Sequence, residues 1–485
     1  MKAGKILGFA VGPIGAAILG AITLPASTWM FGAQDIGRIA MLQTVTSLLI
    51  ILFGLGLDQG YLREYHRASN RPALFRQVTA PGLAVCLLGG IGVLVIAPER
   101  FAMTVFGSPE AGLAYAAMLA VLAAYCSRYF SLILRMEERG LAFSMSQLLP
   151  KIIFLGALLL MYLSDGHRIF AWLLAAHLSS ILATTLIFAW NTRHVWLSPR
   201  GVATDDPPKL GKLLGFGLPL MLAGLAFWGL EAIDKVMLRY LGSFAGLGIY
   251  SVAAGIASIA GTLSLIFTTI WVPTAYRWAD EPDCAQRIEA VARKLVVTGS
   301  LLVCLAGSST WLLGFLLPKE YAAVQYLVCA CMMPPVLYAV AEVTGIGSGI
   351  TRKSFPVMST AIVVSAFNVG ANWLLIPRLG AHGAAISTAI AYFLLFVLRT
   401  EISIRCWAPM RRSALYAPIA AITAMAVLFA LAGATYPKSA AVVWAGAGLL
   451  IVSMNLETFK DVLAKLRLAG RAGTAQASPY TSAAD

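Results

Sequence analysis

The sequence predicts an all-α polytopic membrane protein with 14 transmembrane helices, arranged as two parallel six-helix repeats plus two C-terminal helices. Three observations lead to this prediction: the composition, the length of the apolar runs and an internal repeat. The 485 residues are 59% hydrophobic and 12% charged, with a mean hydropathy of +0.80. So little charge cannot cover the surface of a soluble protein of this size, and we expect the chain to lie in a membrane.

The apolar runs have the length of about 20 residues that a helix needs to cross the hydrocarbon core. Barrel strands would be half as long and would alternate in polarity. The first run follows Lys2 and Lys5 and exceeds the apolar part of a signal peptide, so we expect it to be retained. The predicted helices cover residues 6–28, 39–57, 78–97, 112–134, 143–163, 169–190, 213–234, 248–272, 295–317, 322–347, 355–376, 382–399, 414–434 and 440–456.

The positive charges predict the orientation of these helices. With the N-terminus placed in the cytoplasm, 26 of the 36 lysines and arginines fall in cytoplasmic segments and eight in outside segments. Cytoplasmic loops of membrane proteins carry such an excess, so both termini are expected in the cytoplasm. Because the cations are spread over short loops, the net charge of +14 does not indicate nucleic acid as a partner.

An internal repeat begins at residue 211. Residues 211–216, GKLLGF, match residues 4–9, GKILGF, with one conservative change, and both copies then enter an apolar run. Further on, residues 247–251, LGIYS, are the counterpart of residues 36–40, IGRIA. Six predicted helices separate the copies. An even number means that both copies run in the same direction, related by a pseudo-twofold axis along the membrane normal.

The repeat also predicts the organisation of the chain. Residues 1–190 form the N-terminal lobe, and residues 191–212 form a cytoplasmic linker that is polar and rich in Pro and Gly. Residues 213–400 form the second lobe, residues 401–457 add helices 13 and 14, and residues 458–485 are a cytoplasmic tail without an apolar face.

Motifs of enzymes and metal sites are missing from the sequence. It contains no phosphate-binding loop of the Walker type, no HExxH and no Gly-x-Ser-x-Gly. None of the seven cysteines needs a disulfide partner. Cys329 and Cys331 are two apart on a predicted helix and so point in different directions, which disfavours a metal pair. We expect no catalytic residue, no metal and no cofactor.

Four stretches carry a resemblance to a known family. They are residues 31–38, FGAQDIGR; residues 54–65, GLGLDQGYLREY; residues 234–242, DKVMLRYLG, with GIYS at 248–251; and residues 375–380, LIPRLG, with GAA at 383–385. Each stretch is short, but their order and spacing span nearly the whole chain. Together they resemble the Wzx-type polysaccharide flippases, of the superfamily that also contains the multidrug and toxin extruders and the lipid II flippases.

The resemblance implies a V-shaped pair of lobes that alternates between inward-open and outward-open states. It implies a flippase of the bacterial inner membrane rather than an enzyme, driven by a proton or sodium gradient. The implied cargo is an undecaprenyl-pyrophosphate-linked oligosaccharide for O-antigen, capsule or exopolysaccharide. The implied partners are this glycolipid, membrane lipids, a polysaccharide polymerase and assembly proteins.

A pyrophosphate group that crosses a membrane needs a hydrated, cationic cleft, and three cations are candidates. Arg128 lies about two turns inside its helix, where it could line the cleft or reach the lipid headgroups. Lys151 follows Pro150, which could kink the helix and aim the ammonium inward. Arg63 belongs to the expected inner mouth, although an ordinary positive inside loop explains it equally well. The lipid II flippases carry arginines on their first two helices, whereas the first helix here is uncharged.

Acidic and mixed clusters are candidates for the coupling-ion site or a gate. Glu231, Lys235 and Arg239 follow one stripe at the outer end of the seventh helix, with Asp234 beside it. This stripe is either a salt-bridged helix end or an ionic latch of the outer gate.

Two further carboxylates and three polar residues complete the candidates. Asp58 lies at the inner mouth, and Glu342 lies inside the tenth helix, where a buried carboxylate would suit a coupling ion. His177 is either a packing residue or a proton carrier. Asn368 and Asn372 lie one turn apart and could bond neighbouring helices.

Two other functions remain open. A multidrug extruder on the same frame would need an apolar cavity with a few acids instead of cations. A membrane glycosyltransferase or polysaccharide polymerase would need a large outside loop with catalytic residues, and no predicted outside loop exceeds roughly twenty residues.

Overall fold

The structure is a computed structural model that describes residues 3–164, 169–198 and 208–456. Within these residues the chain forms helices and no strand. The predicted tail and the middle of the predicted linker lie outside them. Thirteen of the described helices are long and apolar enough to span a membrane, and the last one, α19 (Pro437–Met454), is apolar but shorter. The predicted all-α multi-pass fold is confirmed.

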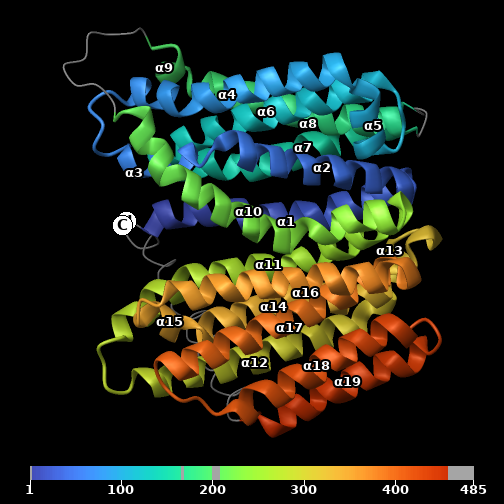
Figure 1. The fold of residues 1–485 in the computed structure, drawn as a ribbon. Coiled ribbons are helices and arrows are strands. Elements are labelled where there is room, and N and C mark those ends of the chain that lie inside the picture. Colours follow the sequence, from blue (N-terminus) through green and yellow to red (C-terminus); the bar gives the residue numbers. More distant parts are fainter. Residues whose placement is uncertain (1–2, 165–168, 199–207, 457–485) are drawn as a thin grey trace, which may run out of the picture.

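The helices form two bundles that lie side by side (Figure 1). The first bundle contains the first nine helices: α1 (Ala3–Met30), α2 (Ala33–Gly54), α3 (Leu57–Glu64), α4 (Arg71–Ile96), α5 (Pro98–Phe106), α6 (Ala111–Met136), α7 (Gly140–Leu163), α8 (Phe170–Asn191) and α9 (Arg193–Trp196).

The second bundle contains the remaining elements: α10 (Leu210–Leu241), α11 (Phe244–Trp278), α12 (Cys284–Ser309), η1 (Thr310–Leu312), α13 (Leu313–Leu316), η2 (Lys319–Tyr321), α14 (Val324–Thr344), α15 (Ile346–Ile350), α16 (Ser354–Leu379), α17 (Ala381–Cys406), α18 (Arg412–Ala432) and α19. Helices α18 and α19 are packed into this bundle, since Trp444 is 2% exposed and its ring fills the space that Gly307 of α12 leaves open.

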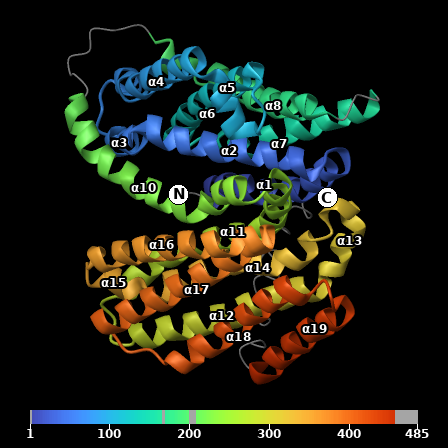
Figure 2. The ribbon, with the colours of Figure 1, turned by 45° about the vertical axis from the view of Figure 1, so that its right-hand side comes forward.

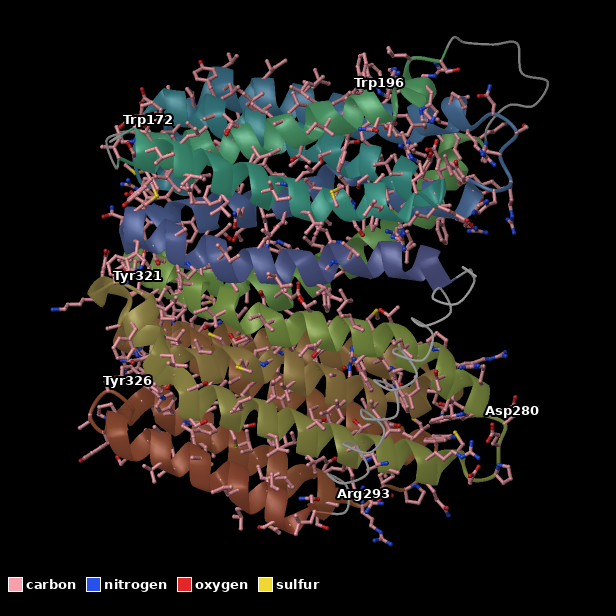
Figure 3. The ribbon with its side chains drawn as sticks, turned by 180° about the vertical axis from the view of Figure 1, so that it is seen from behind. Trp172, Trp196, Asp280, Arg293, Tyr321 and Tyr326 are labelled. Atoms are coloured by element: carbon pink, nitrogen blue, oxygen red, sulfur yellow. The ribbon has the colours of Figure 1, made fainter. Side chains whose placement is uncertain are left out.

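We term the end that carries α5, α13 and η2 the distal end, and the end that carries α3, α9 and α15 the proximal end (Figure 1). Seen from behind, Tyr321 marks the distal end, and Asp280 and Arg293 mark the proximal end (Figure 3). The predicted topology assigns the distal end to the outside.

The structure corrects several predicted helix bounds. The second predicted helix, 39–57, begins earlier at Ala33 and ends at Gly54. Leu55 and Gly56 then adopt left-handed backbone angles, with φ of 50° and 67°, and the chain restarts as α3. Two residues with left-handed backbone angles cannot continue a right-handed helix. The prediction missed this break because the pattern of apolar residues continues through it.

Helix α10 joins the two bundles. Its proximal half packs on the first bundle, where Leu213 belongs to the same buried cluster as Leu57 and Tyr61 of α3. Its distal half packs on the second bundle, where Leu230 and Leu238 are buried. Figure 2 shows α10 curving from one bundle to the other. The prediction assigned α10 from residue 213 onward to the second lobe, because the sequence of an apolar run does not show where its neighbours change.

Gly56 allows α10 to lie directly against the break after α2. A Cβ atom at Gly56 would overlap the carbonyl group of Gly217, and one at Gly217 would lie 2.7 Å from the carbonyl oxygen of Gly56. Glycine also tolerates the left-handed angle at Gly56 without strain. The two backbones therefore touch only because both residues lack a side chain.

The change Gly56→Ala should destabilise the protein by about 1–3 kcal/mol, since it adds backbone strain and an overlap with α10. Gly215→Ala is the matched control, because its Cβ would have no neighbour within 4 Å. Thermal unfolding in detergent, followed by tryptophan fluorescence, measures both. An unchanged melting temperature in Gly56→Ala would contradict the close contact.

Candidate functional site

The second bundle encloses a buried carboxylate. Asp234 of α10 is 1% exposed. Its Oδ1 accepts hydrogen bonds from the side-chain amides of Asn368, at 3.0 Å, and Asn372, at 2.6 Å. Its Oδ2 accepts hydrogen bonds from the hydroxyl groups of Tyr250, at 3.0 Å, and Thr388, at 2.5 Å. Four neutral donors from α11, α16 and α17 therefore converge on one buried negative charge.

A second layer orients these donors. Asn372 also donates to Oδ1 of Asn368, at 3.1 Å, and accepts a hydrogen bond from the Ser387 hydroxyl. The hydroxyl oxygens of Thr388 and Ser387 also lie 2.8 and 2.9 Å from the carbonyl oxygen of Ala384, so each hydroxyl shares its one proton between two acceptors. Apart from the amide nitrogens, every polar atom of the cluster is an oxygen. We term Asp234, Tyr250, Asn368, Asn372 and Thr388 the Asp234 cluster.

The cluster differs from the ionic stripe that the spacing predicts. Asp234 points into the bundle, while Glu231 is exposed and Lys235 is half-buried. Arg239 extends to the other bundle, where its guanidinium donates to the carbonyl oxygens of Met103, at 2.9 Å, and Thr104, at 3.3 Å. The spacing of residues along one helix predicts only which side chains of that helix lie close together. The partners of Asp234 come from three other helices, so this spacing could not predict them.

The distal ends of the bundles meet at two glycines. A Cβ at Gly37 of α2 would overlap the carbonyl oxygen of Phe244, and a Cβ at Gly248 of α11 would overlap that of Ala33. In the sequence repeat, Gly37 corresponds to Gly248, and the same register pairs Ala33 with Phe244. Counterparts that contact each other reciprocally lie at a twofold axis, as the parallel repeat predicts. We term this contact the distal seal.

Groups of the second bundle cap the N-terminus of α2. A carboxylate oxygen of Glu320 in η2 accepts a hydrogen bond from the Ala33 amide at 2.7 Å. The Tyr321 hydroxyl, next in the chain, donates to the carbonyl oxygen of Phe31 at 2.9 Å. The residue before α2, Gly32, supplies no side-chain cap of its own. Helix N-termini favour anions, so the Glu320 carboxylate stabilises α2. Because Glu320 belongs to the second bundle, it does so only while the distal seal is closed.

Two of the cations predicted to bind the substrate, Arg128 and Arg63, lie at the proximal end. Arg128 of α6 forms an ion pair with Asp58 of α3 at 3.1 Å, and the Arg128 side chain is 52% exposed. The structure thus joins a predicted substrate residue to a predicted gate residue. Arg63 is equally exposed, with its guanidinium 4.4 Å from the ring centre of Phe216 on α10 and 3.5 Å from the Glu64 carboxylate.

Lys151 is held against α1. Its ammonium donates to the carbonyl oxygen of Ala16 at 2.6 Å, and Gly20 leaves the room for it, since a Cβ there would lie 2.9 Å from the nitrogen. His177 of α8 packs edge-on against the ring of Phe154. Neither residue belongs to the Asp234 cluster.

Glu342 pairs with Arg399 of α17, which donates a hydrogen bond to it. The guanidinium of Arg399 also lies 5.6 Å from the ring centre of Tyr338. The charge of Glu342, a predicted coupling-ion candidate, is therefore already balanced by an arginine.

In residues 3–164, 169–198 and 208–456, no group of three His, Cys, Asp or Glu side chains lies close enough together to hold a metal ion.

Residues 5–278 match the family model described as polysaccharide biosynthesis protein. This match covers more than half of the chain. The chain belongs to the polysaccharide biosynthesis protein family. No curated protein matches the sequence.

Solved structures show the same fold as this family member. The lipid II flippase MurJ, in an inward closed conformation, aligns with a TM-score of 0.68 at 12% identity, over 94% of this chain and 99% of that one. An inward-facing multidrug resistance MATE transporter of the MOP superfamily aligns with a TM-score of 0.55 at 14% identity, over 86% and 99%. The Vibrio cholerae MATE transporter VcmN aligns with 0.53 at 14% identity, over 83% and 95%. The predicted resemblance is confirmed.

Several residues of these sites were absent from the sequence-based candidates. Tyr250 and Thr388 are common residues on apolar helices, and nothing in their spacing singles them out. Glu320 lies in a short connection between predicted helices. Gly37 and Gly248 were detectable, because they occupy the same position in the two copies of the repeat.

The change Glu320→Ala should loosen the start of α2 in this polysaccharide biosynthesis protein. Losing a helix cap costs about 0.5–2 kcal/mol, so hydrogen exchange of the amides in residues 33–37 should become roughly twofold to thirtyfold faster. Hydrogen–deuterium exchange mass spectrometry of the purified protein measures this, with Lys319→Ala as the neighbouring control. Equal exchange in the two variants would show that Glu320 does not cap α2.

Proposed function

We propose that this chain is a flippase that moves an undecaprenyl-pyrophosphate-linked oligosaccharide across the bacterial inner membrane for surface polysaccharide synthesis. The observation that carries the proposal is that a member of the polysaccharide biosynthesis family has the two-bundle fold of MurJ, which is a lipid II flippase. The family description names polysaccharide biosynthesis, and the similar structure is that of a lipid II flippase. The neighbours are transporters, which supports a function without catalysis.

The closed distal seal supports alternating access. The contacts of Gly37, Gly248, Glu320 and Arg239 that join the bundles all lie at the distal end. At the proximal end, α10 supplies the contact with the first bundle through Gly217. Opening the distal end would break the seal, while α10 would keep the bundles connected. The excess of cations at the proximal end supports a cytoplasmic location for that end and for both termini.

Charged groups at the proximal end suit a pyrophosphate. Arg128 and Arg63 are half-exposed, and guanidinium groups bind phosphate oxygens in a bidentate manner. Asp58 would hold Arg128 in place until the cargo competes for it. Lys151 lies deeper, against α1, and we keep it as a candidate for a later position of the same anion. The polyprenyl tail would remain in the surrounding lipid.

The Asp234 cluster supports coupling to a monovalent cation. A carboxylate buried at membrane depth is costly, and four hydrogen bonds offset only part of that cost. The amide oxygens of Asn368 and Asn372, the Thr388 hydroxyl and the Asp234 carboxylate are hard oxygen ligands, which suit sodium. A proton on Asp234 would remove the same charge. Either cation would stabilise the second bundle and could thereby bias the distal seal.

Deleting the gene should abolish surface polysaccharide and cause its lipid-linked precursor to accumulate in the cytoplasmic leaflet. Mass spectrometry of extracted lipids and staining of the cell surface measure the two effects, and expression of the intact protein should reverse both. Normal polysaccharide without precursor accumulation would exclude this function. Increased drug sensitivity in its place would identify a multidrug extruder.

The variant Asp234→Asn should still insert in the membrane, with a lower melting temperature because its amide replaces one acceptor with a donor. It should fail to restore polysaccharide to the deletion strain, because it cannot exchange charge with a cation. If the cation is sodium, the melting temperature of the wild-type protein should rise with sodium concentration, and that of the variant should not. Asp280→Asn, an exposed carboxylate at the proximal end (Figure 3), is the control. Full activity of Asp234→Asn would exclude coupling at this residue.

A further inference from the structure

A polar pocket of about 160 Å³ lies between α3 and the N-terminus of α10, at the proximal end. Three cations line it: Arg63 and Arg67 of the first bundle and Lys212 of α10. Among the described residues that line it, Glu64 is the acidic one, and its carboxylate pairs with Arg63 at 3.5 Å. Within this described lining, Arg67 and Lys212 have no carboxylate to balance their charges.

Neighbouring contacts hold the pocket in shape. The Arg63 guanidinium lies 4.4 Å from the ring centre of Phe216, which also lines the pocket. A Cβ at Gly60 would lie 3.4 Å from Leu213, so the two helices approach closely at the base. The first residue before α10, Lys209, supplies no side-chain cap to the helix. The positive end of a 32-residue helix therefore adds to the charge of the side chains.

We infer that this pocket binds a phosphate-class anion. Its volume of about 160 Å³ has room for a phosphate or a pyrophosphate group. Arginine binds such groups in a bidentate manner, and lysine adds a point charge. The ligand is either the phosphate of a lipid headgroup or a soluble phosphate ester. Both present a tetrahedral phosphate with at least two anionic oxygens to the pocket.

The position of the pocket gives the anion a structural role. Arg63 and Arg67 belong to the first bundle, whereas Lys212 belongs to the helix that crosses to the second one. An anion held by both sides fastens the proximal half of α10 to α3. The proposed function assigns Arg63 to the cargo but does not use Arg67 or Lys212. Within the pocket, the test changes only Arg67 and Lys212, so its failure and the failure of the proposed function are distinguishable.

Binding to the purified protein tests the site, with inorganic pyrophosphate and phosphatidylglycerol vesicles as two separate probes. Either probe should raise the melting temperature of the wild-type protein. In the double variant Arg67→Gln/Lys212→Gln, the apparent Kd should rise roughly tenfold or more. The charge-preserving variant Arg67→Lys/Lys212→Arg should bind with a Kd within a fewfold of wild type, and it controls for misfolding.

A second control removes one lysine and one arginine from the same end of the molecule but away from the pocket. Lys353→Gln/Arg411→Gln does so, since both residues are exposed near the proximal starts of α16 and α18. Stabilisation by vesicles alone identifies a lipid headgroup as the ligand, and stabilisation by pyrophosphate identifies a soluble phosphate as sufficient. No stabilisation by either probe, or equal loss in the two Gln double variants, overturns the site.

Discussion

The contact between α2 and α11 at the distal end determines how the two bundles sit. Helix backbones can approach this closely only where both partners lack a side chain, and Gly37 and Gly248 meet that condition. The contact brings the loop with Glu320 over the start of α2, and it brings Arg239 to the carbonyl groups of α5. The helix cap, the hydrogen bonds and the packing at this end therefore all depend on the close contact between the backbones of α2 and α11.

The buried carboxylate of Asp234 places a second constraint on the second bundle. Its four donors come from three helices that must keep their relative rotation for the hydrogen bonds to form. The first bundle has no buried acid among its described residues, and its ion pair Arg128–Asp58 is half-exposed on the arginine side. The two halves of the repeat thus share a backbone arrangement but differ in where they carry charge.

Sequence reasoning selected many of the residues that matter but grouped them differently. Asp234, Asn368 and Asn372 were each candidates, yet 134 residues separate Asp234 from Asn368, and no local pattern connects them. Glu231 and Lys235 were grouped with Asp234 because residues three or four apart lie on the same face of a helix. Arg128 and Asp58 were assigned to different roles, although they form one ion pair. The Asp234 cluster also needs Tyr250 and Thr388, whose types and positions resemble those of many packing residues.

The features that the sequence determined by itself are those that the lipid bilayer imposes on any chain that spans it. A bilayer requires long apolar helices, and it sorts cations to one side, so composition and charge predict the class, the helices and their direction. The repeat adds the parallel relation of the two halves, which the reciprocal contact of Gly37 and Gly248 reproduces. Only the tertiary structure decided that α10 serves both bundles, that Glu320 caps a helix of the other bundle, and which donors meet at Asp234. Those facts depend on the rotation of each helix about its own axis, and that rotation is set by neighbours that are distant in the chain.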